Sequence, residues 1–328
     1  MSANGKLKVG MYWASSCGGC DISLLEIGAR ILDLVQVADV AFWPCAADFK
    51  YRDVAGYPDG HLDVCFYNGG VRNSEQEEVA RLLRKKSRTL VAYGACAADG
   101  GIPALANYKT TREIFRAVYH ENPSIDNPAG VEPQPEVAVE TGTLHLPRFY
   151  PAVLQLGDIV PVDYVIPGCP PQADRVWETI QAVVTGAVPP NNSGLRVGCG
   201  TRTVCDECPR EKRLVKIKEF RRHHEFRPEP GWCLLEQGLL CMGPATRSGC
   251  GALCIKADMR CEGCYGPPAA VEDQGAAMIG ALGGLLDATT EERAREMINE
   301  IVDPVGTFYR FTTSSSLLKV GRHKEERA

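Results

Sequence analysis

Apolar runs and helical segments alternate along the first half of the chain. The apolar runs predict five strands, over residues 8–13, 37–42, 63–67, 89–93 and 163–166. Apolar residues near helical spacing predict a helix over 21–34, and the run S-E-Q-E-E predicts a serine-capped helix over 74–86. Strands separated by helices are typical of a doubly wound parallel sheet, so we expect an α/β domain over residues 1–185.

Two segments leave this pattern. Residues 121–161 carry seven prolines and little periodicity, which indicates a surface insertion that could serve as a docking arm. Residues 185–198 contain paired prolines and paired asparagines and indicate a domain boundary. We expect a second domain over residues 186–328, folded around metal because its cysteines are many and the spacers between them are short. A helix over 291–301 is predicted near its end.

A basic segment over residues 210–227 holds eight Lys or Arg and three acids. Leu214, Ile217 and Phe220 recur at helical spacing, which predicts an exposed amphipathic helix. The alternative is a docking surface for an acidic electron carrier, since complementary charge speeds encounter. His223 and His224 belong to the same segment, either as solvated residues or as neighbours of a metal cluster.

Composition narrows the class of protein. Hydrophobic residues make up 45% and charged residues 23%, which are ordinary values for a globular protein. The formal net charge of −5 disfavours nucleic-acid binding through a basic patch, and the apolar stretch over 276–286 is too short to span a membrane. The N-terminal residues carry no export signal, so we expect a cytoplasmic, reducing compartment, where cysteines serve metals or catalysis more often than disulfides.

Four of the fifteen cysteines follow predicted strands directly: Cys17, Cys20, Cys96 and Cys169. The carboxyl ends of parallel strands share one edge of a sheet, so these four side chains can form one site. Four thiolates hold one cubane iron–sulfur cluster. Buried apolar cysteines are the alternative, because cysteine is among the most buried residue types.

Eight further cysteines lie within 60 residues of the second domain. Sequence order divides them into two sets of four, enough for two more cubanes: Cys205, Cys208, Cys233 and Cys241, then Cys250, Cys254, Cys261 and Cys264. Cys199 could compete for a place, and Cys45 and Cys65 lie among apolar residues and are expected to be structural. Because the C-x-x-C pairs resemble a zinc ribbon, a four-thiolate zinc site is the alternative.

Six motifs carry a resemblance to a known family. C-x-x-C at 17–20, G-A-C-A at 94–97 and P-G-C-P-P at 167–171 resemble the small subunit of NiFe hydrogenases. The C-terminal motifs are similar to those of the cytoplasmic methyl-viologen-reducing branch, whose members commonly work with heterodisulfide reductase: V-C-D-E-C-P at 204–209, C-L-L-E-Q-G-L-L-C-M-G-P at 233–244 and G-C-G-A-L-C at 249–254. The resemblance covers nearly the whole chain.

This resemblance implies a flavodoxin-like N-terminal domain, a C-terminal iron–sulfur domain of little regular structure, and three 4Fe–4S clusters. The implied ligands are Cys17, Cys20, Cys96 and Cys169 (proximal), Cys250, Cys254, Cys261 and Cys264 (medial), and Cys205, Cys208, Cys233 and Cys241 (distal). Exported members of the family often have a histidine where Cys205 stands and lack a medial cysteine that Cys254 supplies here. An all-cysteine distal site should have a lower reduction potential than a histidine-ligated one.

The same resemblance implies partners. This chain lacks the large-subunit context D-P-C-x-x-C, so the NiFe centre is expected in a large-subunit partner that abuts the proximal cluster. Electrons should leave through the distal cluster, toward a small iron–sulfur adaptor subunit and a heterodisulfide reductase. Asp21 and Glu26 follow the proximal motif and are candidates for proton exit. Two alternatives stay open: a quinone-oxidoreductase iron–sulfur subunit, whose cluster uses adjacent cysteines, and a zinc-stabilised scaffold.

Overall fold

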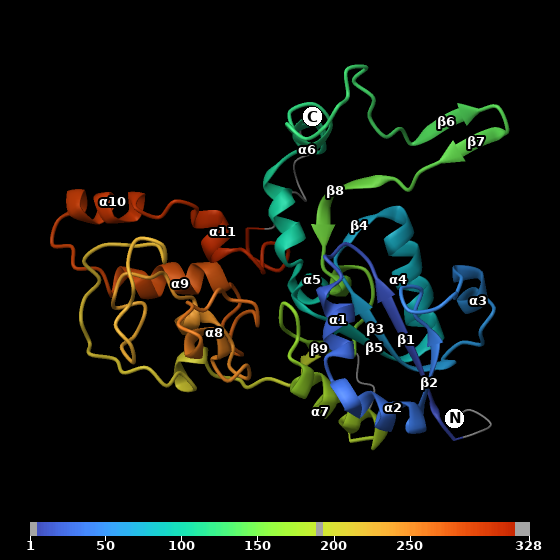
Figure 1. The fold of residues 1–328 in the computed structure, drawn as a ribbon, viewed down its shortest axis with the longest axis horizontal. Helices are drawn as coiled ribbons and strands as arrows, with labels where there is room; N and C mark the ends of the chain where they lie inside the picture. The colour runs from blue at the N-terminus through green and yellow to red at the C-terminus, as the bar shows by residue number, and fades with distance from the viewer. Residues whose placement is uncertain (1–4, 188–192, 319–328) are drawn as a thin grey trace.

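A six-stranded parallel sheet forms the centre of the first half of the protein (Figure 1). The computed structural model describes residues 5–187 and 193–318. The sheet order is β10-β9-β5-β3-β1-β2, with bounds β1 Leu7–Trp13, β2 Ala38–Phe42, β3 Leu62–Asn68, β5 Ser87–Tyr93, β9 Tyr164–Ile166 and β10 Leu195–Arg196. Counted along the chain, this is the 2-1-3-4-5 order of flavodoxin-like folds with a sixth strand added. The predicted α/β class is confirmed.

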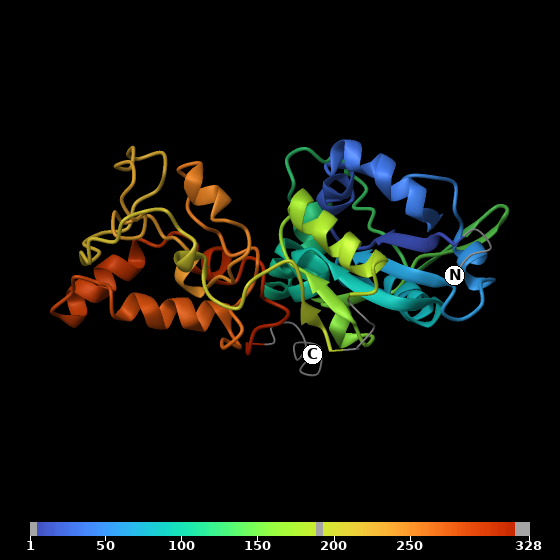
Figure 2. The same ribbon diagram turned by 90° about the horizontal axis from the view of Figure 1, so that it is seen from below.

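Helices cover both faces of the sheet (Figure 2). On one face lie α1 (Gly19–Leu25), α2 (Ile31–Val37) and α7 (Ala173–Val184), and on the other lie α3 (Tyr51–Ala55) and α4 (Ser74–Lys86). Three shorter helices join the strands: α5 (Ala95–Asp99) and the 3-10 helices Ile102–Tyr108 and Leu156–Asp158.

The central strand β3 shows how this layering follows from the sequence. Successive side chains of a strand point to opposite faces of the sheet. Phe66 therefore belongs to the same core as Leu24 of α1 and Val176 of α7, whereas Tyr67 belongs to the core of Val79 on α4. A strand buried on both faces is apolar at most positions, and in β3 these are Val64 to Tyr67, which is why it was recognisable as an apolar run.

Two helices differ in detail from the prediction. The helix expected over 21–34 is broken, because Gly28 has φ +66°, a left-handed conformation that an α-helix does not contain. A 3-10 turn over Gly28–Arg30 separates α1 from α2. α4 has the predicted bounds, but Asn73 rather than Ser74 caps it: the Asn73 side chain accepts a hydrogen bond from the Gln76 N–H at 2.9 Å.

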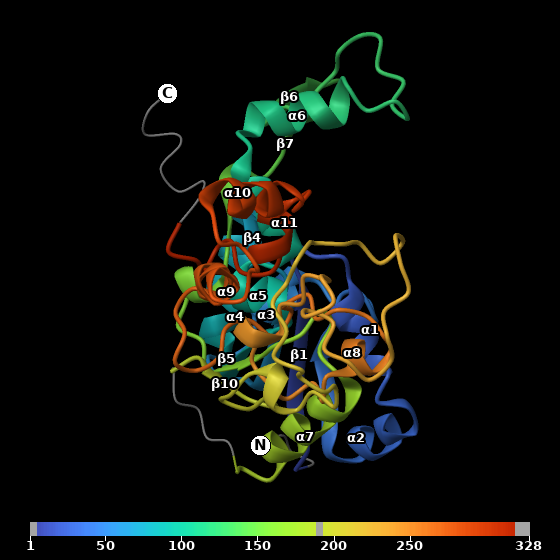
Figure 3. The ribbon, with the colours of Figure 1, turned by 90° about the vertical axis from the view of Figure 1, so that its left-hand side faces the viewer.

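The proline-rich insertion contains an arm that stands away from the body (Figures 1 and 3). α6 (Thr111–Tyr119) leads into it, β6 (Glu136–Val139) and β7 (Gly142–His145) form an antiparallel hairpin, and β8 (Phe149–Leu154) returns to pair with β4 (Val71–Asn73). Every residue of the hairpin strands is exposed. The surface insertion predicted over 121–161 agrees with the exposure of the hairpin but was wrong for its last part, because Val153 and Leu156 are buried in the sheet domain. The use of the arm in docking stays a prediction.

The C-terminal region is mostly irregular (Figure 1). Its helices are α8 Leu253–Lys256, α9 Gln274–Gly283, α10 Glu291–Asn299 and α11 Pro304–Phe308, with 3-10 turns over Val204–Asp206 and Gly243–Ala245. α10 matches the helix predicted over 291–301. The region has an apolar core of its own, which includes Leu239, Met278 and Phe308. Among the described helices, none has the length and apolar character needed to cross a membrane.

Several connections join this region to the sheet domain, among them bonds from the Gln172 and Arg175 side chains to the carbonyls of Cys250 and Gly249. The short strand β10 (Leu195–Arg196) extends the sheet beyond residue 185, where the domain boundary was expected. Near the other end, the Gly101 N–H donates to the Phe311 carbonyl at 3.1 Å, and Ser314 Oγ donates to the Val153 carbonyl at 2.6 Å. The chain therefore leaves the sheet after β10 and returns to it near residue 311.

The helix predicted over residues 210–227 was wrong. The segment, called the basic strap below, is extended and irregular, and its backbone pairs with distant residues, Ile217 with Leu286 and Arg221 with Leu239. Leu214 is exposed whereas Ile217 is buried, although a helix would place both on one face. Leu214, Ile217 and Phe220 are spaced as in a helix, but each has a separate environment along the extended strap.

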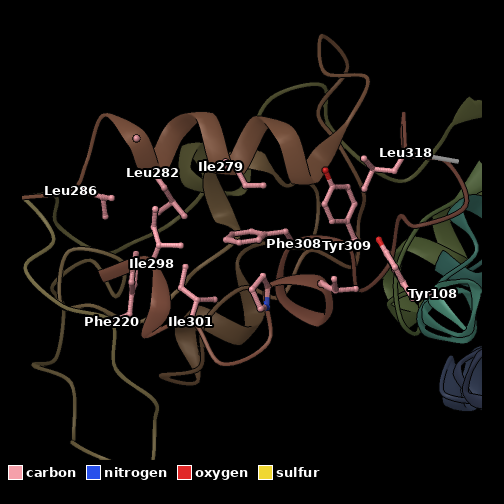
Figure 4. A pocket seen from close by; sticks show the side chains of 13 residues that line it. Tyr108, Phe220, Ile279, Leu282, Leu286, Ile298, Ile301, Phe308, Tyr309 and Leu318 are labelled. Atoms are coloured by element: carbon pink, nitrogen blue, oxygen red, sulfur yellow. The ribbon is translucent and has the colours of Figure 1, made fainter. Parts of the chain in front are cut away.

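An apolar cavity of about 410 Å³ lies between α9, α10 and α11 (Figure 4). Leu282, Ile298 and Phe308 line it from these helices. Phe220 of the basic strap and Tyr108 of the sheet domain complete its wall. The strap therefore contributes one residue, Phe220, to this apolar cavity and another, Leu214, to the surface.

Candidate metal centres

The proximal quartet lies where three parallel strands end: Cys17 and Cys20 after β1, Cys96 after β5 and Cys169 after β9. The loops after β5 and β9 are joined by their backbones. The Gly94 N–H donates to the Ile166 carbonyl at 2.8 Å, and the Ala95 N–H donates to the Gly168 carbonyl at 2.7 Å. These bonds hold Cys96 and Cys169 beside each other, although 73 residues separate them in the sequence.

The four proximal thiols lie close enough to perturb one another. Burial, followed by the charges of Cys169 and Cys17, raises the pKa of Cys96 to about 12. The pKa of Cys20 is raised by burial first and then by the other three thiols. Four mutually repelling thiolates need cations to neutralise them, and metal binding displaces their protons. The donor set therefore fits an iron–sulfur cluster.

Two glycines make room for these sulfur atoms. A Cβ at Gly94 would lie within 3.0 Å of the Cys20 sulfur, and a Cβ at Gly101 would lie 2.5 Å from the Cys96 sulfur. Both glycines have positive φ, +84° and +59°. Gly94 was recognisable from its motif, whereas nothing in the local pattern pointed to Gly101.

Asp21, next to Cys20, is a buried carboxylate with two donors. Trp43 Nε1 donates to its Oδ1 at 2.8 Å, and Asn68 Nδ2 donates to its Oδ2 at 2.7 Å. Neither donor was recognisable from the sequence, because Trp43 and Asn68 come from the ends of two other strands, β2 and β3. Glu26, the other candidate for proton exit, is exposed at the end of α1.

The distal quartet surrounds a cavity of about 480 Å³, lined by Cys205, Cys208, Cys233 and Cys241. Cys205 lies in the 3-10 turn that Thr203 and Asp206 cap by reciprocal hydrogen bonds. Burial raises the pKa of Cys205 to about 12; the charge of Lys212 opposes this rise, and the other three thiols add to it. The structure thus brings these four thiols together.

The medial quartet lines a second cavity, of about 410 Å³, with Cys250, Cys254, Cys261 and Cys264. α8 carries Cys254, and Glu207 accepts hydrogen bonds from the Gly249 N–H at 3.0 and 3.1 Å, which fixes the loop that holds Cys250. Burial raises the pKa of Cys264 to about 12, with further contributions from Cys250, Cys169 and Cys254.

The three quartets lie in series. Cys169 of the proximal quartet also lines the medial cavity. At the other side of the medial quartet, the Cys261 N–H donates to the Cys241 sulfur of the distal quartet at 3.3 Å. The medial quartet therefore lies between the other two.

Three cysteines and a histidine lie outside these groups. Cys199 lines neither cavity; burial raises its pKa, and Arg247 and Arg196 oppose the rise. Cys65 is buried in the sheet core, as expected, but Cys45 is exposed, so its predicted apolar surroundings were wrong. His223 Nε2 accepts from the Arg260 N–H at 3.3 Å and lines neither cavity.

Each of these two cavities offers four thiols as donors to a metal group. Across residues 5–187 and 193–318, no group of three His, Cys, Asp or Glu side chains has the spacing of a single-ion site. Four thiolates are the donor set of a cubane iron–sulfur cluster, and a four-thiolate zinc site uses the same donors.

Known proteins are similar to this chain over nearly its whole length. The iron–sulfur subunit of the F420-non-reducing hydrogenase of Archaeoglobus profundus is 37% identical over 318 residues, 95% of this chain and 98% of its own. The corresponding F420-non-reducing hydrogenase subunit of Methanothermobacter thermautotrophicus is 37% identical over 327 residues, 98% of each chain. The chain belongs to this family of hydrogenase iron–sulfur subunits. It is a NiFe hydrogenase small subunit, passes electrons through iron–sulfur clusters and works in a complex with a large subunit.

The similarity to other proteins extends to different points along the chain. The family model of the NADH ubiquinone oxidoreductase 20 Kd subunit matches residues 17–183 of the hydrogenase small subunit and ends before the eight C-terminal cysteines. The H2-activated [NiFeSe]-hydrogenase of Desulfomicrobium baculatum shares the fold, with a TM-score of 0.51 and 20% identity over 80% of this chain and 95% of that chain. Similarity to hydrogenases thus extends through the C-terminal region, where the quinone-oxidoreductase model stops.

Proposed function

We propose that this small subunit carries electrons from H2 oxidation in the large subunit through three 4Fe–4S clusters to a cytoplasmic redox partner. The proposed ligands are Cys17, Cys20, Cys96 and Cys169 (proximal), Cys250, Cys254, Cys261 and Cys264 (medial), and Cys205, Cys208, Cys233 and Cys241 (distal). The serial contact of the three quartets, through Cys169 and through the Cys261–Cys241 hydrogen bond, is the observation that supports this route most strongly.

Each end of the route has its own environment. Cys17 is the exposed member of the proximal quartet, which supports a partner that covers it, and we assign this side to the large subunit. At the other end, four thiolates and no histidine keep the distal potential low, because neutral ligands raise cluster potentials. When bound, the clusters supply one-electron transfer, and the chain holds them at fixed separations.

The acceptor is proposed to be a heterodisulfide reductase, reached through a small iron–sulfur adaptor subunit. The relatives of this chain are named F420-non-reducing, which supports an acceptor other than F420. Native purification tests this part: both partners should co-elute with the hydrogenase, and their complete absence from a complex that oxidises H2 would count against them.

Sulfide analysis of the large-subunit–small-subunit complex tests the route itself. Three cubanes predict about twelve acid-labile sulfides per small subunit. About four would instead favour a quinone-oxidoreductase type of subunit with one cluster. Zinc without sulfide would favour the scaffold function.

A further inference from the structure

The basic strap borders the solvent side of the distal quartet. Six of its residues line the distal cavity together with the cysteines, and they include Lys212, Leu214 and Lys216. The strap lies at the end of the C-terminal region that is far from the sheet (Figures 1 and 2). A partner that approaches the last quartet from solvent therefore meets these side chains.

Leu214 is presented to solvent by a structured turn. Its side chain is 89% exposed and its φ is +57°, which is unusual for a bulky residue. Glu236 fixes this conformation, because its carboxylate accepts from the Arg213 N–H at 2.9 Å and from the Leu214 N–H at 3.1 Å. Trp232 Nε1 donates to the same carboxylate at 2.6 Å. The backbone at this exposed leucine is thus fixed by hydrogen bonds.

Two lysines beside this leucine form no ion pair with a described residue, and the nearby Glu236 carboxylate is one negative charge against their two positive ones. Three arginines of the strap do form ion pairs: Arg210 with Asp258, Arg213 with Glu229, and Arg221 with Glu219. Within the described part of the chain, Lys212 makes no ion pair and Lys216 donates to a backbone carbonyl, that of Gly284. This local positive charge contrasts with the formal net charge of −5 for the whole chain.

We infer that the mouth of the distal cavity is a docking site for an acidic redox protein, with carboxylates opposite Lys212 and Lys216 and an apolar spot over Leu214. Opposite charges at the rim raise the rate of encounter, and a covered leucine gives the contact an apolar centre. The inference rests on the proposed function, since it takes the distal quartet to hold the last cluster. One electron would pass from the reduced distal cluster to the oxidised centre of the partner, with no bond made or broken.

The test uses the complex of the large and small subunits, freed of the proposed adaptor subunit that would cover the distal cavity, and two protein probes of opposite charge. The rate of H2-dependent reduction is measured with an acidic two-cluster ferredoxin and with basic cytochrome c. Each rate is divided by the rate with benzyl viologen, which gives a ferredoxin ratio and a cytochrome ratio. The K212E/K216E variant should lower the ferredoxin ratio about tenfold and raise the cytochrome ratio. L214S should lower the ferredoxin ratio without changing its dependence on salt.

Arg222 and Arg227 provide a matched control. Both are exposed, lie on the same strap, line no part of the distal cavity and make no ion pair among the described residues. R222E/R227E changes the charge by the same amount as K212E/K216E, so it should change the ferredoxin ratio less than twofold if position matters. Equal losses in the two double variants would overturn the docking site.

The wild-type complex gives a second measurement that requires no folded variant. Ferredoxin reduction should slow as salt rises from about 20 to about 300 mM, because screening weakens contacts between exposed charges. Ferredoxin and cytochrome rates that respond to salt in the same direction would overturn the inference. Failure of the proposed function is distinct: in that case the wild-type complex lacks the predicted sulfide or does not reduce benzyl viologen.

Discussion

The proximal quartet depends on residues that are not ligands. Gly94 and Gly101 leave the space that the sulfur atoms of Cys20 and Cys96 occupy, and both have positive φ. The C-x-x-C motif and the positions after strands predicted where the thiols would meet, because parallel strands end at one edge. The sequence could not indicate Gly101, since its contact with the Cys96 sulfur depends on how the chain turns after α5.

Gly94→Ala should therefore disturb the proximal site selectively. The new Cβ would collide with the Cys20 sulfur, and alanine is strained at φ +84°. Acid-labile sulfide should fall from about twelve to about eight per small subunit, the loss of one cubane. Gly157→Ala is the control, because its Cβ would meet no atom within 4 Å. A full sulfide content in the Gly94 variant would contradict this account.

Asp21 is predicted to stabilise the loop after β1. Its two hydrogen bonds come from buried Trp43 and Asn68, so Asp21→Asn sets a donor against a donor and should cost about 1–3 kcal/mol of stability. Glu26→Gln, at an exposed position, should change stability by less than about 0.5 kcal/mol. Loss of cluster absorbance in guanidinium measures both; equal midpoints would show that the buried bonds matter little.

Elements were predictable where one periodicity governs a whole segment. The apolar runs predicted five of the six strands of the sheet, and α4 has the predicted bounds because one face of the helix packs on the sheet throughout. Prediction failed at Gly28, where a left-handed backbone conformation breaks the predicted helix. It also failed along the basic strap, where individual residues pair with different distant segments rather than forming one face of a helix. In the strap, three apolar residues at helical spacing have three different surroundings.

The helices of the C-terminal region hold its core around the apolar cavity of Figure 4. Phe308 on α11 is buried there, so Phe308→Ala should destabilise the region by about 3–5 kcal/mol. Val302, 72% exposed on the preceding loop, is the control, and Val302→Ala should cost less than about 0.5 kcal/mol. Thermal release of the clusters measures the effect, and similar release temperatures would exclude a structural role for Phe308.

At the scale of the whole molecule, a change of one proposed ligand should shift the reduction potential of the distal cluster. Cys205→His replaces a thiolate with a neutral imidazole, which should raise the distal potential by on the order of 100 mV. Redox titration followed by EPR measures it. Cys199→Ser, beside Gly249 but outside both cavities, should leave all potentials in place. A distal potential already well above the others in the wild type would contradict the low-potential route.

The serial arrangement of the quartets was only partly predictable. Cysteine order in the sequence supplied the sets of four, but the chain visits the distal set before the medial one, so distance along the sequence does not give distance in space. The strand β10 and the return of the chain near residue 311 were also unforeseen, because both depend on long-range pairing.

That return has a mechanical consequence. The C-terminal region is fastened to the sheet domain through β10, through the bonds of Phe311 and Ser314, and through the side chains of Gln172 and Arg175, which donate to the carbonyls of Cys250 and Gly249. A body attached by a single linker can rotate about it, whereas one fastened at several places keeps its orientation. On the proposed route, the gap that an electron must tunnel across between the proximal and medial quartets would therefore stay constant while partner proteins bind and depart.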